Sequence, residues 1–289
     1  MVKFFVLSRF IVRFYKSNIV FLYFLVTLHN FAMYFQKGFF MINSNTFSNF
    51  NSKYPIYADL HTHSISSGHG SEDTITDMIR CASESGLSLF GISDHGPATS
   101  SSAKPSYFQS LKLADRDRFG IRVLYGAELN IINTAGDVDL DDEILSALDY
   151  AIISIHPPIF KPYHDKDLSS AYIRAMDHPK VRFLGHIDDA RFPVDFEYLL
   201  EIAKEKHVYP EINNGSLMPD AYRINGQENC RRILSICKKL DLPVLLSSDS
   251  HGKKNIGNMQ YIFPLLEELD FPAHLVLNSD LSALSDIIR

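Results

Sequence analysis

Short apolar runs alternate with amphipathic stretches from residue 55 onward. In 74–85, apolar residues recur at helical spacing and Gly86 follows the last of them, which predicts a helix. The next run, LSLFGIS, predicts a buried strand. The pattern predicts strands at 56–60, 87–93, 122–128, 150–155, 182–185, 208–212 and 244–248. It predicts helices at 74–85, 107–118, 167–176, 195–206, 227–240, 256–269 and 280–288.

Seven strands joined mostly by helical crossovers indicate an α/β fold with a parallel sheet. Open doubly wound sheets and closed barrels share this pattern. An open sheet gathers its site at one switch point, whereas a barrel takes site residues from the ends of many strands. Six of the seven predicted strands end in His, Glu or Asp. The pattern therefore favours a seven-stranded (βα) barrel.

Nine side chains of metal-ligand type lie at or just beyond the predicted strand ends. His61 and His63 are two residues apart, so they face the same side of a strand. Asp249 and His251 repeat this spacing after the last strand. The full set is His61, His63, His69, His95, Glu128, His156, His186, Asp249 and His251. This exceeds what one tetrahedral zinc ion can use, so the set implies two or three metal ions.

Composition narrows the function classes. The three cysteines are scattered without CxxC spacing, which excludes a disulfide scaffold and a Cys-rich zinc site. The net charge of −6 argues against a basic nucleic-acid-binding surface, so no nucleic-acid partner is expected.

The N-terminal residues differ from the rest of the chain. Residues 1–50 contain five basic and no acidic side chains, and 17–36 is an uncharged, largely apolar stretch. A membrane-spanning helix needs about 20 apolar residues, so 17–36 predicts a membrane anchor if residues 1–40 are translated. We favour the alternative, a cytoplasmic protein that starts at Met41. The expected division is an apolar, basic lead-in with an Asn/Ser-rich linker over 1–54 and a catalytic domain over 55–289.

Six blocks occur in a fixed order, namely YADLHTHS, FGISDHGP, GAELNI, ISIH, PEINN and LSSDSHG. With these blocks the chain resembles the PHP (polymerase and histidinol phosphatase) superfamily, most closely its YcdX-like phosphatase branch. The resemblance extends from Tyr57 to the C-terminus. It implies a distorted seven-stranded (βα) TIM-like barrel, the PHP fold, with its metal site at the C-terminal ends of the strands.

The resemblance also implies three divalent metal ions, zinc first, with manganese or iron as alternatives. His61, His63 and Asp249 would hold one ion, and Glu128 would bridge two, the second of which His156 also binds. The remaining ligands, His69, His95, His186 and His251, would complete the second and third sites.

The implied activity is hydrolysis of phosphoric monoesters by a metal-activated water, and a small phosphorylated metabolite is the expected partner. The alternatives within the family are a histidinol-phosphate phosphatase and a phosphodiesterase or nuclease. A metal-dependent amidohydrolase and a non-catalytic metal-binding module are further alternatives from other classes. A homo-oligomer is left open.

Residues near the ligands are assigned supporting roles. Asp59 and Asp94 are expected to accept hydrogen bonds from ligating imidazoles and so orient them. Asn213 and Asn214 follow the sixth strand and are expected to contact substrate, with capping of the next turn as the alternative. After His186 the chain reads Ile-Asp-Asp, where the YcdX-like branch tends to have Pro-Gly. This loop is therefore expected to differ from the loop of that branch.

Overall fold

The computed structural model describes residues 53–160 and 166–288. The stretch 17–36 and Met41 lie outside the described residues, as do most of the predicted lead-in and the linker. Among the described helices, none has the length and apolar character needed to cross a membrane.

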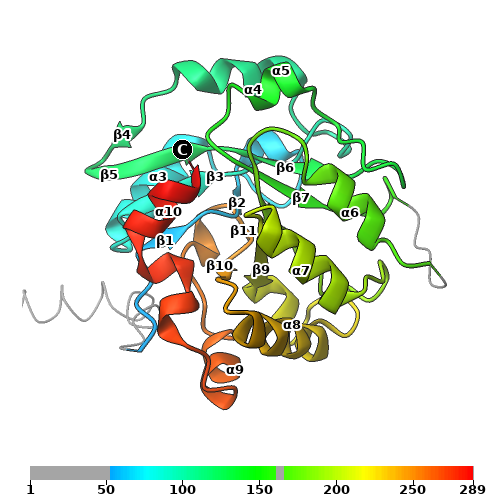
Figure 1. Cartoon of the computed structure of the whole chain (residues 1–289). Helices are drawn as coiled ribbons and strands as arrows, with labels where there is room; N and C mark the ends of the chain where they lie inside the picture. Colours follow the sequence, from blue (N-terminus) through cyan, green and yellow to red (C-terminus); the bar gives the residue numbers. More distant parts are fainter. Residues whose placement is uncertain (1–52, 161–165, 289) are drawn as a thin grey trace, which may run out of the picture. The chain divides into compact units, whose positions relative to one another are not determined.

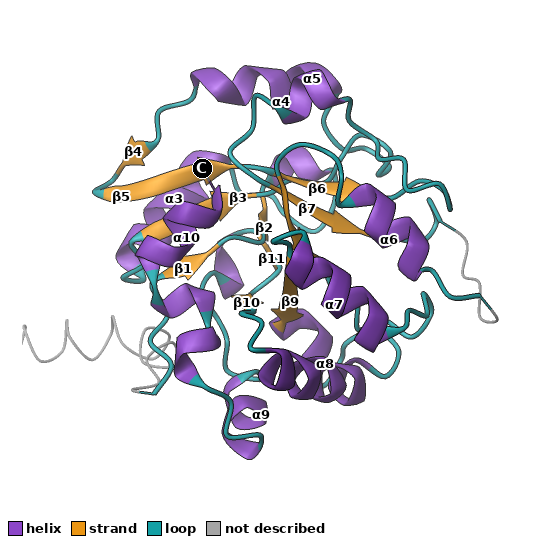
Figure 2. Ribbon diagram, in the orientation of Figure 1, coloured by secondary structure: helices purple, strands orange, loops and turns teal. Residues whose placement is uncertain are grey.

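The described strands form an α/β fold with parallel sheets (Figure 2). The first sheet has the order β1 (Ala58–Asp59), β3 (Leu89–Ile92), β5 (Ile121–Tyr125) and β4 (Asp117–Arg118). The second has the order β10 (Leu245–Ser247), β9 (Tyr209–Asn213), β8 (Val181–Leu184), β7 (Ala151–Ser154) and β6 (Ala127–Asn130). A third pairs β2 (Thr62–His63) with β11 (Ser250–His251). All described pairs are parallel except the one between β4 and β5.

The helices lie outside the strands (Figure 1). They are α3 (Ile75–Glu84), α4 (Pro105–Ser110), α5 (Asp142–Leu145), α6 (Ser169–Ala175), α7 (Phe196–Glu205), α8 (Gly226–Leu240), α9 (Phe263–Glu268) and α10 (Leu281–Ile288). Local sequence sets several boundaries. Thr74 and Asp77 form a capping box at the start of α3, and the Asp195 side chain accepts from the Tyr198 amide at the start of α7.

Two places join the large sheets. The predicted strand 122–128 is divided at Gly126 into β5 and β6, and the Gly126 amide donates to the Ile92 carbonyl at 2.8 Å. A Cβ at Gly126 would lie 2.7 Å from the Tyr150 carbonyl oxygen, so there is no room for a side chain at this position. Between β1 and β10, the Asn278 side chain donates to the carbonyls of Ala58 (2.8 Å) and Leu246 (2.7 Å). The described strands thus form sheets linked at these places, not one continuous seven-stranded ladder.

Two predicted helices are shorter than expected. The 107–118 prediction is wrong in its second half, because α4 ends at Ser110 and Asp117–Arg118 forms β4. There the Arg116 guanidinium turns inward to the Asp149 carboxylate (Nε to Oδ1, 3.0 Å), which fixes an extended segment. The 256–269 helix is reduced to α9, which begins where proline occupies its first turn.

An inner apolar cluster fills the space enclosed by the strands. It contains Ile152 and Phe183 of the strands, Leu60 and Tyr150 beside strand ends, and Leu284 and Ile288 of α10. Since α10 contacts the strand starts (the Arg182 guanidinium donates to the Ile287 carbonyl at 2.6 Å), it covers the N-terminal ends. The C-terminal ends are left for the polar residues of the site.

Candidate metal centre

The structure brings all nine predicted ligand residues together at the C-terminal ends of the strands. Strand pairing does much of this. Parallel pairing of β11 with β2 places His251 opposite His63. A parallel bridge pairs His95 with Glu128. We call the nine residues the His/carboxylate cluster: His61, His63, His69, His95, Glu128, His156, His186, Asp249 and His251.

Glu128 lies at the centre of the cluster and is buried. Its Oε1 lies 2.9 Å from Nε2 of His186 and 3.3 Å from Nε2 of both His61 and His156. Its Oε2 lies 2.7 Å from Nδ1 of His95 and 3.5 Å from Nε2 of His63. A single carboxylate facing this many imidazoles has the position expected of a bridging ligand.

Asp249 forms the second anionic point. Its Oδ1 lies 3.2 Å from Nε2 of His63 and 3.6 Å from Nε2 of His61. His69 lies at the side of the cluster, with its ring stacked on that of His95 at 4.9 Å between centroids and tilted against that of His251 at 5.1 Å. The arrangement therefore extends from Glu128 through Asp249 to the loop that carries His69.

The donor atoms of the cluster fit divalent metal ions. Buried side-chain atoms without a hydrogen-bond partner among the described residues include Nε2 of His61, His63 and His251, Nδ1 of His95 and Oε2 of Glu128. Burying such polar atoms without a hydrogen-bond partner costs free energy. Three sets of three have ligand atoms within 4.8 Å of one another: His63, His95, His251; His61, His63, Asp249; and His95, Glu128, His156. Imidazole and carboxylate donors at this spacing suit zinc, manganese or iron.

Partners on the far side of the rings orient them. Nδ1 of His63 lies 3.0 Å from the Ser67 hydroxyl, and Nδ1 of His156 lies 2.8 Å from Oδ1 of Asn130. The Ser67 hydroxyl itself donates to Asp94 at 2.7 Å, so it accepts from His63. Both rings thus carry their proton on Nδ1 and present an Nε2 lone pair to the cluster.

Electrostatics favour neutral rings at His63 and His156 and a charged carboxylate at Glu128. Burial and the neighbouring His95 and His251 hold the pKa of His63 well below its ordinary value, and burial lowers the pKa of His156. Burial alone would raise the pKa of Glu128, but the surrounding histidines outweigh it and hold that pKa well below the ordinary value. His61 is the exception. Burial opposes its charge, yet Glu211, Glu128 and Asp249 raise its pKa well above the ordinary value.

Glu211 is a site residue that the sequence interpretation missed. It is buried on β9, and its Oε1 lies 2.5 Å from Nδ1 of His61. Its Oε2 accepts from the backbone amide of His186 at 2.8 Å. Glu211 is two residues before Asn213 on a strand, which places it on the same face, so strand alternation was the signal that could have identified it.

The two aspartates predicted to orient imidazoles act differently from the prediction. Asp59 accepts from the Ser248 hydroxyl (2.5 Å) and the Gly257 amide (2.8 Å), and among the described residues no hydrogen bond joins it to an imidazole. Burial raises its pKa to about 6. Asp94 reaches His63 only through Ser67. The carboxylate that contacts an imidazole from outside the cluster is Glu211.

The predicted substrate contacts of Asn213 and Asn214 are corrected by their placement. Both side chains are buried, and neither lines the pocket described below. Oδ1 of Asn213 accepts from the Gly215 amide (2.8 Å) and caps the following turn, while its amide donates to Asp249 (3.0 Å). Asn214 accepts from the Tyr261 amide at 3.0 Å. Capping, the alternative from the sequence, matches the geometry of Asn213, whereas Asn214 bonds a distant segment.

The Ile-Asp-Asp departure after His186 places two acids beside the cluster. Asp188 is buried, both of its carboxylate oxygens lack a partner among the described residues, and burial raises its pKa to about 6. Asp189 instead pairs with Arg191. The loop also packs on the start of α8, since the Asn229 side-chain amide donates to the Asp188 carbonyl at 2.7 Å.

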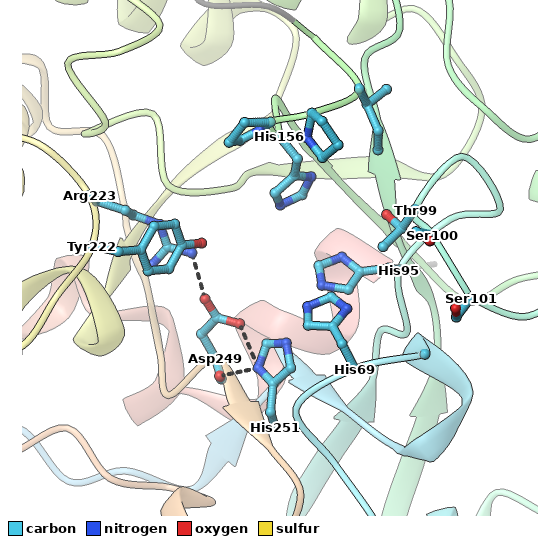
Figure 3. Close-up of a pocket in the computed structure, with 14 residues that line it drawn as sticks. His69, His95, Thr99, Ser100, Ser101, His156, Tyr222, Arg223, Asp249 and His251 are labelled. Atoms are coloured by element: carbon cyan, nitrogen blue, oxygen red, sulfur yellow. Dashed lines mark hydrogen bonds and ion pairs between the residues drawn. The ribbon is translucent and has the colours of Figure 1, made fainter.

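A pocket of about 400 Å³ opens over the cluster (Figure 3). Arg223 and Tyr222 lie on one side of it, and Thr99, Ser100 and Ser101 on the other. Arg223, which the sequence interpretation also missed, is buried and donates to Oδ2 of Asp249 at 2.8 Å and to the Ser216 hydroxyl at 3.1 Å. A guanidinium at the edge of the metal-binding cluster can hold an anion close to it.

Comparisons with known proteins identify the family of the chain. Residues 59–215 match the model of the PHP domain family. The chain is 37% identical over 222 residues to a probable phosphatase of Clostridium acetobutylicum, covering 77% of this chain and 90% of that protein. It is 33% identical over 231 residues to a probable phosphatase of Acetivibrio thermocellus, covering 80% and 94%.

Solved structures are similar in fold. A histidinol phosphate phosphatase from Lactococcus lactis, in complex with zinc, L-histidinol and phosphate, matches with a TM-score of 0.52 and 20% identity over 74% of this chain and 94% of that chain. A chain of an archaeal ribonuclease P with mature tRNA also matches, with a TM-score of 0.52 and 18% identity over 80% and 89%. At these identities the likeness concerns the fold alone.

Proposed function

The chain belongs to the PHP domain family and is a phosphatase like its relatives, and from this premise we propose that it hydrolyses phosphoric monoesters with three divalent metal ions. The observation that carries the proposal is the convergence of unpartnered, buried donor atoms around Glu128. The three overlapping ligand sets support three ions. Zinc is the first candidate, with manganese or iron as alternatives.

Divalent ions bound in such a cluster activate water and offset the negative charge on the phosphoryl oxygens. In the balanced reaction the water oxygen bonds to phosphorus, the bond from phosphorus to the ester oxygen breaks, and the alcohol leaves with a proton. The protein forms no covalent bond. Its own residues act by orientation: Glu211 fixes His61, Ser67 fixes His63, and Asn130 fixes His156.

Arg223 is the side chain best placed to hold the phosphoryl group. It lines the pocket and is fixed by Asp249 and Ser216, so its position is set before substrate binds. The positive charge of bound metal ions and Arg223 supports a monoester, because the terminal phosphoryl dianion of a monoester carries more negative charge than the phosphoryl group of a diester. A small phosphorylated metabolite fits the pocket volume of about 400 Å³.

The links between the two large sheets also support a proposal for the closed fold. We propose that β1, β3, β5 with β6, β7, β8, β9 and β10 act as a distorted seven-stranded barrel. Gly126 marks the seam between its two sheets, and Asn278 joins the other two edges. This arrangement explains why ligands from the first and last strands meet.

The test is hydrolysis by the full chain after metal removal and reloading with zinc or manganese. The proposal expects metal-dependent turnover of p-nitrophenyl phosphate well above that of bis(p-nitrophenyl) phosphate. A preference for the diester would place the protein with the phosphodiesterases of the family. Metal binding without turnover of either ester would contradict a phosphatase function.

A further inference from the structure

The walls of the pocket above the His/carboxylate cluster differ chemically. One wall is the turn containing Thr99, Ser100 and Ser101, and the facing wall contains Tyr222 and Arg223 (Figure 3). If the phosphoryl group of a substrate is held at the cluster, the alcohol part of that substrate lies between these walls. Their chemistry therefore bears on which alcohol is released.

The described walls carry no spare negative charge. Asp249 is the single carboxylate among the described lining residues, and Arg223 and the cluster histidines already face it. The Arg191 guanidinium lies 5.2 Å from the centroid of the Tyr222 ring, as does that of Arg223. An ammonium group on the alcohol would find no unpaired carboxylate among these described residues. A charge that leaves water without gaining a partner disfavours such a ligand.

The turn opposite Tyr222 presents hydroxyl groups. Ser100 and Ser101 are exposed, and among the described residues no hydrogen bond engages either hydroxyl. The turn itself is held firmly: the Ser102 amide donates to the Thr99 carbonyl (3.1 Å) and the Ala103 amide to the Ser66 carbonyl (2.8 Å). These two hydroxyls are thus donors and acceptors presented at a fixed place on the rim.

Tyr222 supplies the apolar surface of the facing wall. It is 65% exposed despite lining the pocket. The two guanidinium groups near its ring favour one orientation of that ring. A flat aromatic face suits the carbon–hydrogen face of a sugar or polyol, whose hydroxyls point sideways.

From these observations we infer that the alcohol released is an uncharged, hydroxyl-rich molecule, so that the substrate class is the monophosphate ester of a small sugar or polyol. Ser100 and Ser101 bond its hydroxyls, and Tyr222 packs against its carbon skeleton. The inference rests on the proposed phosphatase function, and it names the leaving group that the function left open.

The first experiment compares esters on the zinc-loaded full chain, with p-nitrophenyl phosphate as the reference. We expect kcat/KM for glucose 6-phosphate to exceed that for phosphoethanolamine and for histidinol phosphate by about 10-fold, the equivalent of one or two hydrogen bonds. Equal or faster turnover of the cationic esters would overturn the inference while leaving the phosphatase function intact. Absence of turnover with every ester, the reference included, would overturn both.

Binding gives a comparison without turnover. The phosphonate analogues of glucose 6-phosphate and phosphoethanolamine are titrated into the same protein. The sugar phosphonate should bind more tightly, and tighter binding of the aminoalkyl phosphonate would overturn the inference.

A variant pair tests the hydroxyl turn. Replacing both serines (Ser100→Ala with Ser101→Ala) should raise KM for glucose 6-phosphate about 3- to 10-fold more than KM for p-nitrophenyl phosphate, whose leaving group has no sugar hydroxyls. Ser235→Ala, on the exposed side of α8, is the matched control and should change neither KM. Equal changes in the two KM values would show that the serines do not contact the leaving group.

Discussion

The imidazole of His61 lies against the carboxylate of Glu211, with 2.5 Å between Nδ1 and Oε1. The same carboxylate accepts from the His186 amide (2.8 Å) and from the Ser247 hydroxyl. Glu211 therefore connects residues that follow β1 and β8 with β10. Since Nδ1 of His61 is engaged, its Nε2 is directed at Glu128 and Asp249. One buried side chain thus aligns ligands from several strands.

Replacing this carboxylate should weaken metal binding. Glu211→Gln keeps the shape but removes the charge that favours the Nδ1–H tautomer of His61. Loss of such a partner costs about 10- to 100-fold in metal affinity or activity. Competition with a chelating dye measures the affinity for zinc, and circular dichroism measures whether the fold is kept.

Glu205→Gln at the exposed end of α7 is the matched control and should bind zinc as the unmodified chain does. Unchanged zinc affinity in the Glu211 variant would mean that His61 is oriented by other contacts, or that it does not bind metal.

The placement of the candidate ligands could be predicted from sequence because strand ends are set by local pattern. The spacing of His61 and His63 and of Asp249 and His251 follows strand alternation, and the structure places both pairs at the cluster. The partners behind the ligands were harder to predict. Asp94 sits beside a ligand in sequence but bonds Ser64, Ser67 and Tyr107, whereas Glu211 comes from a distant strand.

The same distinction applies to the fold and the pocket. Helix and strand identities followed from periodicity, but the ends of 107–118 and 256–269 depended on tertiary contacts such as the one from Arg116 to Asp149. Arg223 lies on a loop without periodicity, so its burial beside Asp249 depends on how that loop folds back over the cluster. Sequence patterns carry no information about such long-range contacts.

Arg223 should govern recognition of phosphate. Arg223→Lys keeps the charge but loses the planar fork that can bond Asp249, Ser216 and a ligand together. We expect kcat/KM for p-nitrophenyl phosphate to fall about 10- to 100-fold. The inhibition constant of inorganic phosphate should rise with it, and steady-state kinetics measure both.

Arg231→Lys on the surface of α8 is the control for the same chemical change. If the Arg223 variant had unchanged phosphate inhibition and a normal metal content, Arg223 would not contact the phosphoryl group.

Metal removal should lower both activity and stability. Without bound cations, Glu128 stays buried and Asp249 stays mostly buried, with unpartnered imidazole nitrogens around them. A ligand that binds only the folded state stabilises it, by about 2.7 kcal/mol at a concentration 100 times its dissociation constant. Chelation should therefore lower the Tm in differential scanning calorimetry, and added zinc should restore it. A Tm that did not respond to chelation, in protein shown to have lost its metal, would contradict a built metal centre.

The ion pair of Asp189 and Arg191 makes one contribution to stability depend on pH. The Asp189 carboxylate is buried and accepts from the Arg191 side chain at Nε (3.0 and 2.9 Å). Burial alone would raise its pKa, but the hydrogen bonds and charge of Arg191 outweigh burial and lower the pKa below its ordinary value. The unfolded chain therefore binds a proton more readily than the folded chain. Stability from this pair is present above the unfolded pKa of about 4 and is lost as pH falls through the lower, folded value.

Asp189→Asn should accordingly destabilise the protein at pH 7 but not in strong acid. We expect the free energy of unfolding in urea to fall by about 1–2 kcal/mol at pH 7, the scale of hydrogen bonds to a charged group, and the difference to shrink as the pH is lowered below 4. Asp117→Asn removes an exposed carboxylate from its pair with Arg122 (2.9 Å) and, as the matched control, should change stability by less than about 1 kcal/mol, since exposed pairs contribute little. A loss in the Asp189 variant that stayed constant with pH would mean that the side chain acts through packing and not through its charge.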